Sequence, residues 1–244
     1  MDKQQKLTII IPCYNEEKGI PNLAKQLNPV LETLKKQYSI EVLFIDDGST
    51  DNTYELLHHY FKDLNHTEII KHGKNRNLGG ALKTGFYHAS GDLVATLDSD
   101  CTYNPALLIE LLDLLDKHTD IVTVSPYHPK GKVNNVPKYR VFLSKAVSQF
   151  YRTLLSSKLH TYTAMVRVYR KDVVRNVQFK SNTFLGVTEI MIRSILKDYS
   201  VKELPAELNV RKFGKSKMKT LSVMLDHVNL LSKIVLYRFL GKEI

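Results

Sequence analysis

The sequence has 244 residues, 43% of them hydrophobic, which is enough for one large domain or two small ones with a sizeable core. Its formal net charge of +10 favours polyanionic neighbours, namely nucleic acid, an anionic membrane surface or phosphorylated substrates. Cys13 and Cys101 lie far apart in sequence, which argues against a disulfide framework and a zinc site and fits a reducing, cytosolic setting.

Neither apolar end of the chain is expected to enter a membrane. The first apolar segment, residues 7–11, is too short for a secretory leader and is followed by Pro12. The longest apolar stretch, residues 221–240, is interrupted by polar and charged side chains, which disfavour a membrane span: Asp226, His227, Asn229, Lys233 and Arg238. We therefore predict no signal peptide and no transmembrane helix.

Strand-like and helical segments alternate in the first half of the chain. Runs rich in β-branched residues predict strands at residues 7–11, 41–45, 67–71, 93–97 and 121–124. Apolar residues at helical spacing predict helices at residues 16–36, after residue 51, at 79–88 and at 105–117. This alternation predicts βαβ units and an α/β fold with a mostly parallel central sheet flanked by helices.

The second half predicts a less regular arrangement. A polar segment at residues 127–138 is expected to be a mobile loop, in the position of an active-site flap. The predicted elements that follow are a helix from 140 to about 156, a strand at 165–170, a helix at 187–197, an extended segment at 201–210, a basic loop at 211–217 and a last helix from about 218.

Two carboxylates separated by one residue, Asp98 and Asp100, follow the apolar strand at residues 93–97. In open α/β sheets, ligands bind at the carboxyl ends of the strands. Carboxylates in this position can ligate Mg²⁺ or Mn²⁺, and such hard cations bridge diphosphate oxygens. A structural alternative is that Asp100 caps the helix that starts near Pro105.

Two other strand ends also carry polar side chains. Asp46 and Asp47 begin a turn that can hydrogen-bond a ribose or a base, while Ser49 or Asp51 caps the next helix. The first strand ends in residues that can contact a base, although Asn15 as a helix N-cap is an equally natural account of them: Pro12, Tyr14, Asn15 and Glu16.

In order and spacing, these segments resemble glycosyltransferase family 2 proteins of GT-A fold. The matching pieces are IIIPCYNEE at 9–17, FIDDGSTDNT at 44–53, NLGGALKTG at 77–85 and GDLVATLDSD at 91–100. Further pieces resemble the branch of dolichol-phosphate mannosyltransferases and polyprenyl-phosphate glycosyltransferases: YHPKG at 127–131, PKYR at 137–140, YTAMVRVYR at 162–170 and FGKSK at 213–217. We expect a catalytic GT-A domain over residues 1–217 and a C-terminal amphipathic helix over 218–244.

The resemblance implies roles for individual residues. The expected nucleotide-sugar-binding residues are Pro12, Tyr14, Asn15, Glu16, Asp46, Asp47, Lys83, Asp98, Ser99 and Asp100, with Asp98 and Asp100 also holding Mg²⁺ or Mn²⁺. The residues expected to face the donor diphosphate or the acceptor phosphate are Arg140, Arg211, Lys215, Ser216 and Lys217. Two positions depart from the branch: Pro126, where Arg is frequent, and Thr102, where Gln is frequent.

The function implied by the resemblance is inverting, metal-dependent transfer of a hexose from a GDP- or UDP-sugar to a polyprenyl phosphate. The enzyme would act in the cytoplasm, peripherally at the cytosolic face of a membrane. Since a phosphate nucleophile is already ionised, catalysis would rest on positioning and charge stabilisation, with Arg140 among the catalytic residues. A second hypothesis is transfer to a sugar hydroxyl with Glu189 as the base; its structural alternative is an acid in the first turn of a helix.

A basic nucleic-acid-binding protein would also explain the charge, but the sequence has no RNP-like aromatic motif and no groove-reading module, so we predict no nucleic-acid partner. The histidines, His72 included, show no metal-binding spacing, and surface or core roles are predicted for them, with His128 in the supposed flap as the exception to be tested. Gly79, Gly80 and Gly85 lack the Rossmann spacing and predict close helix packing.

The last helix is expected to dock, to mediate homo-oligomerisation or to lie on a membrane, through Leu221, Met224, Leu225, Val228, Leu231 and Val235.

Overall fold

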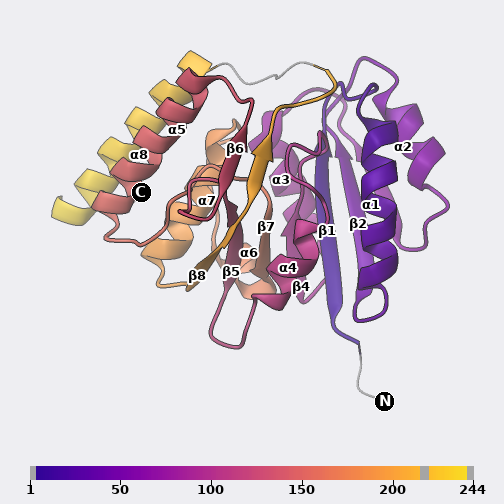
Figure 1. Cartoon of the computed structure of the whole chain (residues 1–244), viewed down its shortest axis with the longest axis horizontal. Helices are drawn as coiled ribbons and strands as arrows, with labels where there is room; N and C mark the ends of the chain where they lie inside the picture. The colour runs from indigo at the N-terminus through magenta and orange to yellow at the C-terminus, as the bar shows by residue number, and fades with distance from the viewer. Residues whose placement is uncertain (1–3, 215–219, 241–244) are drawn as a thin grey trace.

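The computed structural model describes residues 4–214 and 220–240, and within them a seven-stranded sheet has the order β3-β2-β1-β4-β7-β5-β8 (Figure 1). Only β7 runs antiparallel to its neighbours in that sheet. The strands are β1 (Lys6–Cys13), β2 (Ser39–Asp46), β3 (Thr67–Lys71), β4 (Leu93–Thr96), β5 (Ile121–Ser125), β7 (Arg167–Arg170) and β8 (Val201–Pro205). The predicted α/β fold with a mostly parallel sheet is confirmed.

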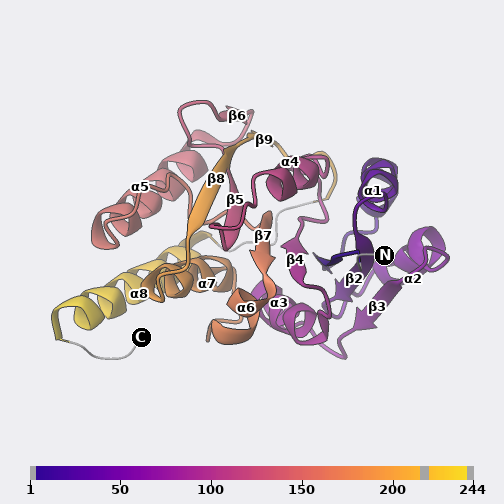
Figure 2. The same ribbon diagram turned by 90° about the horizontal axis from the view of Figure 1, so that it is seen from below.

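Helices cover both faces of the sheet (Figure 2). One face carries α1 (Ile20–Leu34), α2 (Thr53–Phe61) and α4 (Leu107–Asp113), and the other carries α3 (Asn77–His88), α6 (Lys171–Asn176) and α7 (Leu185–Leu196). Consecutive side chains of β1 enter opposite cores: Ile9 and Ile11 pack towards α1, and Ile10 packs towards α3. A strand buried on both faces must be apolar throughout, which explains the unbroken isoleucine run.

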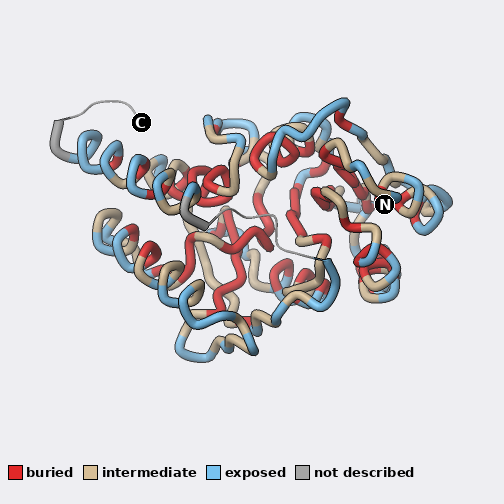
Figure 3. The backbone as a smooth tube through the Cα atoms, turned by 90° about the horizontal axis from the view of Figure 1, so that it is seen from above, coloured by how far each residue is buried: buried red, intermediate tan, exposed pale blue. Residues whose placement is uncertain are grey.

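Two long helices, α5 (Lys138–Leu154) and α8 (Thr220–Leu240), lie side by side beyond the β8 side of the sheet (Figure 1). The Tyr151 hydroxyl is hydrogen-bonded to His227 Nδ1 at 2.9 Å, and Arg238 donates to the carbonyl of Leu154. Figure 3 shows exposed residues along both helices. Within residues 4–214 and 220–240, no helix combines the length and the apolar character that crossing a bilayer requires.

The apolar face expected for the last helix is divided in the structure. His227, Leu230 and Ile234 form the buried face, while Leu225 and Val228 are 64% and 60% exposed. Because apolar residues surround most of this helix, spacing alone did not identify the side that packs against the protein.

Several element boundaries also differ from expectation. The supposed flap contains β6 (Lys132–Asn134), which pairs in parallel with β9 (Glu207–Asn209), so the expected plain loop is wrong in this part. This pairing is non-local, and the prolines and glycine around it conceal it in the sequence. The first helix begins at Ile20, not at residue 16, and the short helix α6 was not predicted.

Glu41 on β2 forms hydrogen bonds with residues of β1 and with the segment that precedes β4. Its carboxylate accepts hydrogen bonds from Thr8 Oγ1 at 2.5 Å, from the Ser90 hydroxyl at 2.5 Å and from Lys6 Nζ at 3.0 Å. Burial raises the pKa of Glu41, but these donors outweigh burial and hold the pKa at about 2. The native state therefore stabilises the ionised carboxylate.

We expect Glu41→Gln to lower the free energy of unfolding at pH 7 by about 1–3 kcal/mol, because charge-assisted hydrogen bonds are lost. Since the folded pKa lies below the unfolded value of about 4.3, this contribution is present above that value and is lost as pH falls towards 2. Urea titrations at pH 7 and pH 3 check both points. Glu68→Gln, at an exposed position on β3, is the matched control, and equal destabilisation by the two variants would contradict the prediction.

Candidate functional site

Strand register brings the predicted site residues to one edge of the sheet. Cys13 at the end of β1 is paired with Asp46 at the end of β2, and Asp46 is paired with Lys71 at the end of β3. On the other side of β1, Thr96 at the end of β4 is paired with Ile10. The segments that follow β1, β2 and β4 therefore emerge at the same carboxyl edge.

The turns after β1 and β2 are hydrogen-bonded to each other. Asn15 N–H donates to Ser49 Oγ at 2.9 Å, and Asn15 Oδ1 accepts from Thr50 N–H at 2.8 Å. Glu16 N–H donates to Thr53 Oγ1 at 2.7 Å. The possible N-cap role of Asn15 is therefore corrected: α1 begins five residues later, at Ile20, and Asn15 joins the two turns.

Asp46 and Asp47 are buried beside these turns. Asp46 Oδ1 accepts from Ser49 N–H at 3.1 Å, whereas Oδ2 has no hydrogen-bond partner among the described residues. Burial raises the pKa of Asp47, opposed by hydrogen bonds from Arg76 N–H and His72. A buried carboxylate oxygen without a partner is costly unless a ligand satisfies it, which makes this edge a candidate binding site.

Gly48 allows the β2 turn to close against the next loop. Its φ of +71° lies in the left-handed region, and a Cβ there would come within 2.7 Å of the carbonyl carbon of Lys74. Glycine is therefore required by both conformation and space.

A second group of acids is gathered around Arg211. The guanidinium of Arg211 pairs with Glu16 and reaches Asp100 Oδ2 at 3.7 Å. Burial raises the pKa of Asp98, the nearby Asp100 and Glu16 raise it further, and Arg211 opposes them. The side chains of this group come from the ends of β1 and β4 and from the segment after β9.

Asp98 and Asp100 are suited to hold a hard cation. Asp100 Oδ1 accepts from Thr102 N–H at 3.0 Å, whereas α4 begins only at Leu107, so the helix-cap alternative for Asp100 is not what the structure has. Over the described part of the chain, no three acidic, histidine or cysteine side chains are arranged as a complete metal site. A cation at this pair would therefore need further oxygen ligands from a bound diphosphate or from water.

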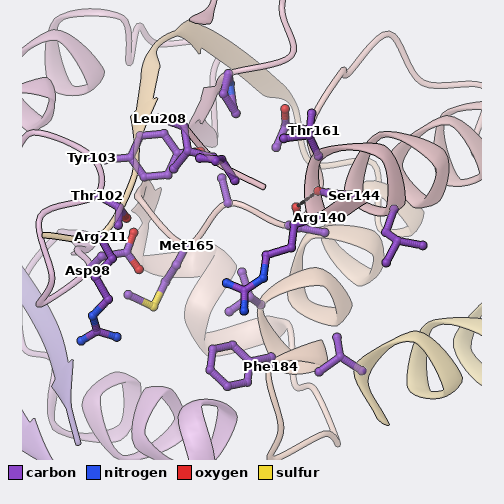
Figure 4. A pocket seen from close by; sticks show the side chains of 18 of the residues that line it. Asp98, Thr102, Tyr103, Arg140, Ser144, Thr161, Met165, Phe184, Leu208 and Arg211 are labelled. Atoms are coloured by element: carbon purple, nitrogen blue, oxygen red, sulfur yellow. Dashed lines mark hydrogen bonds between the residues drawn. The ribbon is translucent and has the colours of Figure 1, made fainter. Parts of the chain in front are cut away.

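A cavity of about 660 Å³ extends from these acids to the paired helices (Figure 4). Asp98, Asp100 and Arg211 line its polar end, and the Arg140 side chain points into it from α5. Its apolar wall comes mainly from α5, α7, α8 and β9, and includes Val141, Leu143, Val147, Val187, Leu208, Val223 and Met224. The two departures from the family pattern, Thr102 and Pro126, also line it.

Lys83 and Glu189 both form hydrogen bonds with the segment at residues 180–182. Lys83 Nζ donates to the Lys180 carbonyl and to Asn182 Oδ1, both at 2.7 Å. Glu189 is buried and lies beyond the first turn of α7, so the alternative of an exposed first-turn acid is wrong. It accepts from the backbone N–H groups of Lys180 and Ser181 and from Arg193 Nε. Burial raises the pKa of Glu189, but these bonds outweigh burial and leave it lowered. Both Glu189 oxygens therefore already hold the 180–181 backbone.

The other expected residues are placed as follows. Pro12 is buried, Tyr14 is half-buried, and Ser99 is buried between the two metal-binding candidates. Gly79, Gly80 and Gly85 pack closely, as predicted: a Cβ on Gly79 would come within 2.4 Å of the Ser181 carbonyl oxygen. Lys215, Ser216 and Lys217 lie outside the described residues, as does the boundary expected at 217/218.

Sequence reasoning missed His72, which is buried and contacts both Asp47 and Thr84. The available signal was its position: it directly follows β3, whose end is in register with Asp46.

Comparison with known proteins identifies the family of the chain. The family model described as glycosyl transferase family 2 matches residues 8–178. Dolichol-phosphate mannosyltransferase from Pyrococcus furiosus is 30% identical over 233 residues, which cover 93% of this chain and 64% of that protein. Polyprenol monophosphomannose synthase from Mycolicibacterium smegmatis is 29% identical over 221 residues, with 88% and 81% covered. The chain thus spans less than two thirds of the Pyrococcus protein.

Solved structures with the same arrangement include glucosyl-3-phosphoglycerate synthase from Mycobacterium tuberculosis. Its complex with Mn²⁺, UDP and glucosyl-3-phosphoglycerate matches with a TM-score of 0.69 at 16% identity, covering 96% of this chain and 80% of that one. Its complex with Mg²⁺ and UDP matches with a TM-score of 0.69, covering 96% and 79%. This likeness confirms the expected GT-A fold.

In ligand-free protein with a chelator present, we expect Asp98→Asn to raise the free energy of unfolding at pH 7.5 by about 0.5–2 kcal/mol. The folded pKa of Asp98 is raised, so its ionised form costs stability above the unfolded pKa of about 3.9. The advantage of the variant should therefore grow as pH rises from 5 to 7.5, as measured by urea unfolding. The exposed Asp63→Asn is the control, and a less stable Asp98→Asn would contradict the prediction.

Proposed function

The chain belongs to glycosyl transferase family 2, and on this premise we propose that it is an inverting transferase that moves a hexose from a GDP- or UDP-sugar to a polyprenyl phosphate. The observation that carries the proposal is the cavity of about 660 Å³, which joins a carboxylate-lined end to an apolar wall from α5, α7, α8 and β9. A charged donor and an acceptor with a long apolar tail need these two environments next to each other. The names of the Pyrococcus and Mycolicibacterium relatives support the acceptor class.

The donor is proposed to bind at the carboxyl edge. Asp46 and Asp47 with the β1 turn would contact the nucleoside, and Asp98 and Asp100 would hold Mg²⁺ or Mn²⁺. The fit rests on two carboxylates at one strand end, with Asp98 destabilised as an anion until a cation compensates it. When bound, the ion would neutralise charge on the departing nucleoside diphosphate. The mycobacterial synthase, which has the same fold, was crystallised with UDP together with either Mn²⁺ or Mg²⁺, which supports a divalent ion beside the donor.

The acceptor phosphate is proposed to lie between Arg140 and Arg211, which line the same cavity. Its oxygen is already ionised at neutral pH, so the chain needs no base to activate it. The two guanidiniums orient the phosphate and offset the repulsion between it and the anionic donor. The apolar side chains of α5, α7 and α8 exclude water and hold the first part of the polyprenyl chain.

Transfer to a sugar hydroxyl has less support because it requires a base. Glu189 is the residue considered for that role. Both of its carboxylate oxygens already accept hydrogen bonds, from the backbone N–H groups of residues 180–181 and from Arg193. Its lowered pKa also weakens it as a base.

Peripheral binding to an anionic membrane is proposed for the outer sides of α5 and α8. Exposed apolar side chains on these helices include Tyr139, Phe142, Phe150, Leu225, Val228 and Leu236. Lys145, Lys158 and Lys233 are exposed on or next to the same helices. Apolar side chains that enter the headgroup region, surrounded by cations, are the pattern of an interfacial helix. The proposed location is the cytosolic face of a membrane.

Activity should require both acids and a divalent ion. In assays of GDP- and UDP-hexoses with polyprenyl phosphate in detergent, we expect Asp98→Asn and Asp100→Asn each to lower kcat/KM by about 100-fold or more, since charge stabilisation is lost. Asp63→Asn should leave it unchanged. EDTA should abolish turnover, and Mn²⁺ or Mg²⁺ should restore it.

Parallel reactions with soluble glycans test the hydroxyl-acceptor alternative. Product from glycans but not from polyprenyl phosphate would refute the proposed acceptor, and full turnover in EDTA would refute the metal. If no nucleotide-sugar binds, and salt-dependent nucleic-acid binding persists in both Asp variants, the chain is instead a nucleic-acid-binding protein.

Membrane binding should depend on the exposed rings of α5. We expect Phe142→Ser combined with Phe150→Ser to weaken partitioning onto anionic vesicles by about tenfold or more, because each ring contributes buried apolar area. Tyr87→Ser removes an 87% exposed ring from α3 and serves as the control. Vesicle co-sedimentation at two salt concentrations measures the effect. Equal binding by the double variant and the control would refute this face.

A further inference from the structure

His72 joins the candidate nucleoside site to helix α3. It follows the last residue of β3, is 5% exposed, and its N–H donates to the Asp46 carbonyl at 2.8 Å. Its ring lies between two side chains: Nδ1 is 2.7 Å from Asp47 Oδ1, and Nε2 is 2.9 Å from Thr84 Oγ1. Backbone and side chain of His72 therefore contact both acids of the β2 turn.

The hydrogen bonds to Asp47 determine its direction. Oδ1 receives the His72 ring at 2.7 Å and Arg76 N–H at 2.8 Å. With two donors fixed on one oxygen, the plane of the carboxylate is set, and so is the direction in which Oδ2 lies. Arg76 and Asn77 act on this carboxylate through their backbone N–H groups, so His72 is the side-chain donor whose replacement tests this orientation.

The network also determines where the ring carries its proton. Beside an ionised carboxylate, Nδ1 must be the protonated nitrogen. In the neutral ring, Nε2 is then an acceptor, and the Thr84 hydroxyl must donate to it. The other acceptor within reach of that hydroxyl is the Gly80 carbonyl at 3.3 Å, which is a longer contact. Asp47 thus fixes the tautomer, and the Thr84 hydroxyl, which can donate or accept, holds the far side of the ring.

We propose that His72 is the positioning residue for nucleoside recognition: held by Thr84 on α3, it fixes the Asp47 carboxylate in the direction that binds the base or ribose of the donor. This inference rests on the proposed function, and it assigns His72 to the nucleoside half of the donor, not to its diphosphate. Stability alone gives little reason for a buried ring and carboxylate here, since well-packed apolar residues of similar volume commonly serve as well as a buried polar pair.

Amide variants separate the two bonds of the ring. In His72→Asn the side-chain amide takes the place of Nδ1 and keeps a donor for Asp47. In His72→Gln the amide reaches the place of Nε2, so it keeps the Thr84 contact and loses Asp47. His72→Phe loses both bonds but retains an aromatic ring. Thr84→Val keeps the shape of Thr84 and removes the hydroxyl that contacts Nε2.

Calorimetry with UDP and GDP in the presence of Mn²⁺, compared with pyrophosphate and Mn²⁺, measures the two halves of the donor separately. We expect His72→Phe and His72→Gln to weaken binding of the preferred nucleoside diphosphate by about tenfold or more, with Thr84→Val weakened less. His72→Asn should stay within about threefold of the wild type. Pyrophosphate should bind all variants equally, and in turnover the donor KM should rise while kcat is retained.

Each outcome decides between the claims. If the wild type binds a nucleoside diphosphate and His72→Gln binds it as well as His72→Asn does, the positioning role is refuted and the proposed function stands. Equal loss of pyrophosphate binding in the His72 variants would show a general structural effect and would also refute it. If the wild type binds neither nucleotide, the proposed function fails and the inference fails with it. Because the Asn and Gln variants are compared with each other, the result holds even if His72→Phe does not fold.

Discussion

Negative charge is concentrated at one edge of the sheet, and the rest of the site is organised around it. Glu16, Asp46 and Asp47 are almost wholly buried there, and Asp98 is destabilised as an anion. Parallel strands in register make this crowding unavoidable, because each strand delivers its terminal acids to the same edge. The positive charge that compensates these acids comes from elsewhere in the chain: Arg211 lies in the segment after β9.

The cavity connects this charged edge to an apolar region. The two regions are neighbours in space, but their residues are far apart in the sequence. The polar end of the cavity includes Asp98, Asp100 and Arg211, whereas its apolar wall comes from α5, α7, α8 and β9. The Tyr151–His227 hydrogen bond keeps α5 and α8 together, and burial lowers the pKa of His227 to about 4, so this contact is uncharged at neutral pH. Contacts between helices far apart in the sequence therefore help to form the apolar wall of the cavity.

The sequence was sufficient for the parts of the fold that local pattern controls. Runs such as Ile9–Ile11 are apolar because both faces of the strand are buried, and paired acids after β2 and β4 follow from strand direction. It was insufficient where partners are far apart in sequence: the β6–β9 pairing, the contact of His72 with Thr84, and the commitment of Glu189 to the 180–181 backbone. A buried histidine and a surface histidine look alike until the fold brings a partner to one of them.

The antiparallel strand β7 has a consequence for how the chain assembles. It separates β4 from β5, and its Arg167 side chain is wholly buried, donating to the Tyr162 and Val187 carbonyls. Neither β4 nor β5 can complete its hydrogen bonding on that side until residue 170 has left the ribosome, so during synthesis both present open edges. A nascent chain stopped before that point lacks the strand that joins β4 to β5.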